Sequence, residues 1–345
     1  MNVTAQLMLL GLAATGTVEA APAPGISCHD AQAAGEGILP AIFAPGTISG
    51  GAHDAAPTFT PDGATVFFSR SNPSGAAIMI SHRTADGWTT PVVAPFSGEW
   101  NDLEPVMAPD GSYLLFISSR PTMPGQPQID GFFNNQVQPG QGGNIWRVDR
   151  EGDGWSAARR LPDIINAGTS VFAPSLARDG TLYFMRSDPD TRRFRLYRAE
   201  ARGDGYDSPQ PLPFSTGEVT DVDPAVDPDQ RFLIFGSGRY AQRGIDLFIV
   251  ERQGDGWGVP VHLGKSINTP QSDAEPRLSA DGTTLYFSSE RTIAQSFPRV
   301  RADAETAMAA ADQWNNGQYN VWSVPMADVF ARVVGRRPEG AQTPP

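Results

Sequence analysis

One motif recurs five times along this chain of 345 residues. Its fullest copy is Asp102-Leu-Glu-Pro-Val-Met-Ala-Pro-Asp-Gly-Ser-Tyr-Leu-Leu-Phe-Ile-Ser-Ser-Arg120. Every copy has a proline close to its start, and these prolines lie 48, 69, 50 and 52 residues apart: Pro57, Pro105, Pro174, Pro224 and Pro276. Self-similarity at a period of about 50 residues, with strand-forming residues in each unit, is typical of a repeat fold and most often of a β-propeller. The repeat predicts the fold but leaves the function open, because propellers host many chemistries.

Each unit contains four segments with the character of antiparallel strands. An extended run ends in a Pro-Asp-Gly turn, in which proline presets φ and glycine accepts a positive φ. A strongly apolar second strand follows, at residues 113–117 in the second unit, and a third strand at 144–148. A Gly-Asp-Gly turn then leads to a fourth segment that opens with an aromatic residue, here Trp155. Four antiparallel strands make one propeller blade, so the expected fold class is all-β.

The fifth unit has no fourth strand of its own. Residues 37–45 line up with residues 88–95, so we expect the N-terminal segment to supply the missing strand and close the ring, which removes an open sheet edge. This gives five blades; six would require a blade hidden in an insertion, and neither insertion is long enough. The expected organisation is a signal peptide (1–20), a flexible segment (21–37), the β-propeller (38–328) and a polar, Pro-rich tail (329–345).

The N-terminus is typical of an export signal. Residues 7–14 are apolar, and Val18-Glu-Ala20 fits a cleavage site with small residues. The run is too short to span a membrane. A disordered Ala-rich N-terminus is the alternative. The single cysteine, Cys28, cannot form an internal disulfide and lacks the preceding pattern of a lipidated cysteine, so we interpret it as a lone thiol.

The motif also resembles a known repeat. The pattern Asp-x-Glu-Pro followed by Pro-Asp-Gly, with Asn144-Ile-Trp146 and Gly152-Asp-Gly-Trp155 after it, resembles the WD-like propeller repeat of the periplasmic translocation protein TolB. It is still more similar to exported bacterial proteins made of these repeats alone. The resemblance covers residues 38–325 and implies a periplasmic or secreted propeller. TolB also has an N-terminal α/β domain, and the function of that domain is not implied here.

Composition excludes several functions. The formal net charge of −12 argues against a nucleic-acid partner, because phosphate binding requires an excess of Lys and Arg on one face. Four scattered histidines and one cysteine do not provide a His/Cys metal centre, and no Gly-x-Ser-x-Gly motif occurs. We therefore expect no cofactor, no metal site and no transmembrane segment.

Charged residues recur where each first strand begins and each second strand ends, which is one face of the propeller. The acids are Asp54, Asp102, Glu104, Asp221, Asp223, Asp273 and Glu275, and the arginines are Arg70, Arg120, Arg186, Arg239 and Arg291. They could form an acidic rim at the channel mouth that binds a cation or a basic partner. Alternatively, each acid could pair with an arginine on a neighbouring strand. The third unit has no such acid, so Arg186 is the candidate for a free cation.

Two insertions interrupt the repeat on the same face. Residues 121–142 are rich in Gly, Pro, Gln and Asn and carry Phe132 and Phe133. Residues 293–318 contain strong helix formers at 302–314, which predict a short helix over the channel mouth with Trp314 packed or presented. Long loops within a compact fold are often functional, although the first could also be an inert surface loop.

These features favour a non-catalytic binding module for an envelope protein or another periplasmic component. The candidate binding residues are Phe132, Phe133, Trp314, Arg186, Asp102, Glu104, Asp221, Asp223, Asp273 and Glu275. The alternative is a glycan-active hydrolase, which would need two unpaired channel-mouth carboxyls about 5–9.5 Å apart.

Overall fold

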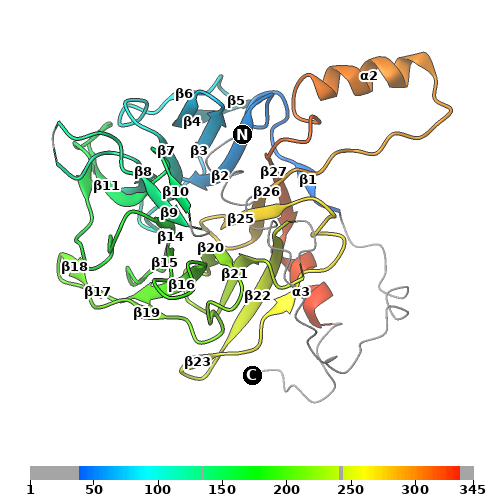
Figure 1. Ribbon diagram of the computed structural model, residues 1–345. Coiled ribbons are helices and arrows are strands. Elements are labelled where there is room, and N and C mark those ends of the chain that lie inside the picture. Colours follow the sequence, from blue (N-terminus) through cyan, green and yellow to red (C-terminus); the bar gives the residue numbers. More distant parts are fainter. Residues whose placement is uncertain (1–38, 124, 134–135, 241–243, 335–345) are drawn as a thin grey trace.

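Five antiparallel sheets surround a common centre in the computed structural model of the protein (Figure 1). The structure describes residues 39–123, 125–133, 136–240 and 244–334. The expected signal peptide, the flexible segment with Cys28 and the tail from residue 335 onward lie outside the described residues. The predicted five-bladed, all-β propeller is confirmed.

The innermost strand of each blade is buried. These first strands are β2 (His53–Phe59), β7 (Asp102–Met107), β14 (Val171–Leu176), β20 (Asp221–Val226) and β25 (Asp273–Leu278). Each contacts the first strand of the blade before and after it, and β25 contacts β2, so they form a closed ring. The second strands are β3 (Thr65–Asn72), β8 (Tyr113–Ser118), β15 (Leu182–Ser187), β21 (Phe232–Ser237) and β26 (Thr284–Ser289).

The outer half of each blade is more exposed and ends in a short fourth strand. The third strands are β4 (Gly75–Thr84), β11 (Asn144–Glu151), β16 (Phe194–Ala199), β22 (Asp246–Gln253) and β27 (Asn320–Pro325). The fourth strands are β6 (Val92–Val93), β13 (Arg159–Arg160), β19 (Gln210–Pro211), β24 (Val261–His262) and β1 (Ala41–Ile42). The Gly-Asp-Gly turns carry the short strands β5 (Gly87–Trp88), β12 (Gly154–Trp155), β17 (Ala201–Arg202), β18 (Gly205–Tyr206) and β23 (Gly256–Trp257).

The ring closes as the sequence predicts. Strand β1 pairs antiparallel with β27, with Ala41 opposite Ser323 and Ile42 opposite Trp322. Phe43 follows β1, and its ring packs edge-on against Phe59 and Trp88 of the first blade and Tyr286 of the fifth. The closing segment therefore joins the first and last blades by backbone pairing and by aromatic packing.

Replacing Phe43 by alanine should lower the free energy of unfolding by about 2 kcal/mol, because a half-buried aromatic contact between two blades is lost. Urea denaturation would measure it. Leu39→Ala is the matched control, since that side chain is exposed. Similar losses in both variants would show that the closing segment contributes no specific packing.

A C-terminal helix was not predicted. Helix α3 (Met326–Val334) follows β27 directly, whereas we expected a polar tail from residue 329. Val329 and Val333 are buried, and Phe330 packs edge-on against Phe232 of the fourth blade. The propeller's packing thus continues beyond the expected boundary at residue 328.

The two insertions have different structures. The first forms a hairpin of β9 (Gly131–Phe133) and β10 (Gln136–Gln138), and the second contains helix α2 (Arg301–Ala311). Helix α2 has no buried residue and stands away from the blades (Figure 1). The helix is therefore present as predicted, but it does not cover the channel mouth. No helix in the described ranges has the length and apolar character needed to cross a membrane.

Candidate functional site

Four of the predicted acid–arginine pairs are present, one in each blade except the third. They are Asp54–Arg70 (2.6 Å), Asp102–Arg120 (3.3 Å), Asp221–Arg239 (3.0 Å) and Asp273–Arg291 (2.8 Å). All four carboxylates are fully buried. Each arginine also donates to a main-chain carbonyl in the segment that leads into its blade, as Arg120 does to Phe96 at 2.7 Å. These pairs fasten that segment to the blade, so Asp102, Asp221 and Asp273 do not form an exposed acidic rim.

Arg186 occupies the equivalent place in the third blade. Its guanidinium lies 4.3 Å from the ring centroid of Tyr197, and the described residues give it no acidic partner. The aromatic ring holds this side chain against the blade.

A β-bulge redirects each first strand just before its repeated proline. The residue ahead of the proline has a positive φ of 48–54° in all five blades: Ala56, Glu104, Ala173, Asp223 and Glu275. Such values are uncommon for non-glycine residues, and the strand register shifts at each of these positions. The carboxyls of Glu104, Asp223 and Glu275 come from the innermost strands of the second, fourth and fifth blades.

Two of the three central carboxyls, those of Glu104 and Asp223, bond directly to the next blade, whereas that of Glu275 bonds within its own blade. Glu104 accepts a hydrogen bond from the backbone N–H of Ala173 (2.6 Å), and Asp223 accepts one from the N–H of Glu275 (3.2 Å). Glu275 in turn accepts from the hydroxyl of Ser288 (2.8 Å). All three residues are about 1% exposed, so the expectation that they lie at an open channel mouth is wrong.

Burial dominates the ionisation of this cluster. It raises the pKa of Glu104 to about 8, and the charges of Asp223 and Glu275 add to the rise. It also raises the pKa of Glu275 to about 7 and that of Asp223 to about 6. Arg277 is 4% exposed, and its charge lowers all three values. No group of three or more His, Cys, Asp or Glu residues in the described ranges is arranged to hold a metal ion.

The six candidate carboxyls therefore do not provide the pair that glycoside hydrolysis uses. Three are paired with arginines and three are enclosed around Arg277. An acid and a base acting on a sugar must both reach the glycosidic bond.

The first insertion is fastened to the third blade. The backbone N–H of Phe132 donates to the hydroxyl of Ser170 (2.8 Å), just ahead of β14. The ring of Phe132 lies 5.0 Å from the guanidinium of Arg192, and Val137 opposite it is exposed. The side chain of Phe133 lies outside what the structure describes.

The second insertion, residues 293–318, is here called the arm. Its base is fixed: Trp314 packs edge-on against Trp322 of β27, with ring centroids 6.1 Å apart, and its carbonyl accepts from Asn320 (2.8 Å). Trp314 is thus packed rather than presented. The arm exposes four large apolar side chains: Ile293 at its start (54%), and Phe297 (76%), Val300 (65%) and Met308 (59%) farther along it.

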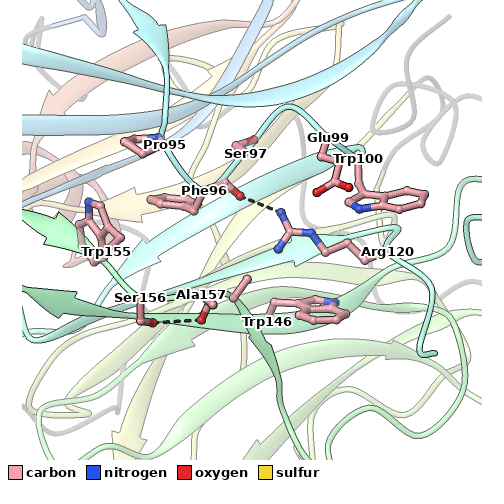
Figure 2. Close-up of a pocket in the computed structure, with 11 residues that line it drawn as sticks. Pro95, Phe96, Ser97, Glu99, Trp100, Arg120, Trp146, Trp155, Ser156 and Ala157 are labelled. Carbon is pink, nitrogen blue, oxygen red and sulfur yellow. Dashed lines mark hydrogen bonds between the residues drawn. The ribbon is translucent and has the colours of Figure 1, made fainter. Parts of the chain in front are cut away.

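A cleft of about 510 Å³ lies at the junction of the first two blades and was not predicted (Figure 2). Its aromatic lining comes from Phe96, Trp100, Trp146 and Trp155. Its polar lining comes from Ser97, Glu99, Arg120 and Ser156. In the sequence Trp146 and Trp155 are explained by the repeat, so neither indicates a binding site. Trp100 lies in a link between blades and belongs to no motif.

The fold defines the class: the protein is a five-bladed β-propeller. Among solved structures it is similar to a thermostable family-43 glycoside hydrolase, with 11% identity, a TM-score of 0.50, and coverage of 83% of this chain and 92% of that one. It is also similar to a putative TolB from Agrobacterium tumefaciens (14% identity, TM-score 0.46, 79% of this chain and 90% of that one). TolB from Acinetobacter baumannii gives 14% identity and a TM-score of 0.45 over 79% of this chain, which spans only 54% of that protein. At these identities the similarities concern the fold alone. No protein-family model and no curated protein matches the sequence.

Proposed function

We propose that this protein is an exported, non-catalytic β-propeller that binds a protein or another component of the cell envelope through its arm. The observation that carries the proposal is the arm's exposed apolar surface. Phe297, Val300 and Met308 are each more than half exposed, and helix α2 buries no residue against its own propeller. Large apolar side chains grouped on one projecting element are typical of a protein-interaction site.

The arm's construction supports the same conclusion. The packing of Trp314 on Trp322 fixes the end of the arm on the propeller, and the bond from the Ile293 N–H to Asn315 Oδ1 (2.7 Å) ties the start of the arm to that end. A fixed base limits the conformational freedom that a partner must restrict, which favours binding. The apolar run and cleavage pattern at residues 1–20 support export, and the acidic composition favours a basic partner surface.

A pull-down from envelope extract tests this proposal. We expect the variant Phe297→Ser/Val300→Ser/Met308→Ser to retain roughly a tenth or less of the partner captured by the unmodified protein, because central apolar anchors dominate binding energy. The three positions are exposed, so thermal denaturation should be unchanged. Val259→Ser is the matched control, since Val259 is 82% exposed on the fourth blade and lies outside the arm. Equal capture by all three proteins would contradict a binding role for the arm.

A further inference from the structure

The cleft is an exception to the internal symmetry of the propeller. One third-strand residue in each blade stands opposite a second-strand phenylalanine, and these residues are Met79, Trp146, Tyr197, Phe248 and Trp322. Four of them are buried, whereas Trp146 is only partly buried. Because the five positions share one place in the repeat, the blade fold alone does not require an accessible tryptophan at residue 146.

In the fourth and fifth blades an additional side chain covers this position: Tyr240 stacks on Phe248 at 5.7 Å, and Trp314 packs on Trp322 at 6.1 Å. In the third blade Arg186, the counterpart of Arg120, covers Tyr197 at 4.3 Å. In the second blade Arg120 lies 5.5 Å from the Trp146 ring, as Arg239 and Arg291 lie near the equivalent rings of their own blades. Beyond that shared arginine the Trp146 side chain faces the cleft (Figure 2).

The lining combines flat aromatic faces with a few polar groups. Arg120 keeps one bond to Asp102 and another to the Phe96 carbonyl, which hold its guanidinium between Phe96 and Trp146. Glu99 is exposed beside it and supplies a carboxylate that accepts hydrogen bonds. The volume falls within the range of about 300–1,000 Å³ that is usual for small-ligand sites.

This combination selects an amphipathic ligand. A wholly apolar ligand would remove water from Arg120 and Glu99 without replacing their hydrogen bonds, which is unfavourable. A cationic ligand would meet the guanidinium that already occupies the aromatic face. A pyranose ring presents an apolar C–H face to indole and hydroxyls at its edge, so it can use the tryptophans, Glu99 and Arg120 together.

We propose that the cleft between the first and second blades binds an oligosaccharide, with a sugar ring stacked on Trp146 and flanked by Trp100, and with sugar hydroxyls bonded to Glu99 and Arg120. This site is separate from the arm. It would let the protein hold a glycan surface while the arm engages its partner.

Isothermal titration calorimetry of the full propeller tests this site. The probes are cellotetraose, chitotetraose, maltotetraose and tetragalacturonate, with a proline-rich peptide as a non-glycan probe. We expect at least one glycan to bind. Trp146→Ala and Trp100→Ala should each raise the Kd for that glycan about tenfold, because a stacking contact is lost. Tyr240→Ala is the matched control, because Tyr240 is an exposed aromatic that stacks on Phe248, the fourth-blade equivalent of Trp146.

Trp100→Ala keeps the test independent of folding, because Trp100 lies in the link that precedes β7, outside the strands. Glu99→Ala, at an exposed position, should weaken the same glycan without a change in thermal denaturation. Failure of all four glycans to bind the unmodified protein would overturn the proposal. So would a glycan affinity that is unchanged in both tryptophan variants, or binding of the peptide alone with the same variant sensitivity.

Discussion

Replacing Arg277 by methionine is expected to lower the free energy of unfolding by about 3–5 kcal/mol at pH 8, the usual cost of leaving buried charge without its partner. Arg277 is buried, and its charge stabilises the ionised forms of Glu104, Asp223 and Glu275. Methionine has a similar volume, so the change removes charge more than packing. At pH 5 the loss should be smaller, because the carboxyls can become protonated and no longer need compensation.

Chemical denaturation at the two pH values measures this effect. Arg202→Met is the matched control, because the Arg202–Asp207 pair is exposed and such pairs contribute only about 0–1 kcal/mol. A loss for Arg277→Met that is the same at pH 5 and pH 8, or no larger than that of the control, would show that the central carboxyls do not depend on Arg277.

The stability of the unmodified protein should fall as the pH rises from 6.5 to 8.5. The folded pKa values of Glu104 (about 8) and Glu275 (about 7) lie above those of unfolded glutamate, so the folded state binds more protons in this window. Stability from such groups is fully present below the unfolded pKa and is lost as the pH rises through the folded pKa. The expected decrease is on the order of 2 kcal/mol across the window.

The pH range from 6.5 to 8.5 lies above the range in which His53 would change the stability in the opposite direction. Burial lowers the pKa of His53 to about 4. Because of this shift, the folded protein loses stability as the pH falls below 6.5, whereas Glu104 and Glu275 make it lose stability as the pH rises. Glu104→Gln should remove most of the decrease in the free energy of unfolding between pH 6.5 and 8.5, because glutamine can still accept the bond from the Ala173 N–H but cannot ionise. Glu218→Gln, at an exposed position, should keep it. Urea denaturation at four pH values between 6.5 and 8.5 measures this pH dependence. If the free energy of unfolding of Glu104→Gln fell with pH as steeply as that of the unmodified protein, Glu104 would not be its source.

The fold could be predicted because its determinants are local and repeated. Each repeated proline is followed by a Pro-Asp-Gly-type turn or a close variant and an apolar strand, and residues 37–45 match a fourth strand that the fifth blade lacks. Helix α3 was missed although Met326, Val329, Phe330 and Val333 have helical spacing, because the Pro-rich residues after it dominated the interpretation.

The candidate site was less predictable because it depends on three-dimensional detail. Asp102 and Glu104 lie two residues apart, which on a regular strand would place both side chains on the same face. The bulge between Leu103 and Val106 separates them, so that Asp102 meets Arg120 while Glu104 enters the ring. The cleft depends on the absence of a covering side chain over Trp146, which no motif records.

The repeat requires some features of this molecule and does not require others. The paired aspartates and their arginines fasten each linking segment to its own blade, and the Glu104 and Asp223 carboxyls bond to the next blade, so their recurrence is explained by structure. The arm and the cleft depart from the repeat and carry exposed apolar or aromatic groups, which the fold does not need. Function is therefore expected at these departures.

The most direct test of the binding role is photo-crosslinking in intact cells that produce the protein. A photoreactive phenylalanine derivative would replace Phe297 on the arm, and in a matched protein it would replace Val259 on the fourth blade. We predict one discrete crosslinked species from position 297, absent from position 259 and abolished by Val300→Ser/Met308→Ser in the same chain. Crosslinks that are absent from position 297, or equal at the two positions, would contradict the conclusion that the arm binds a partner.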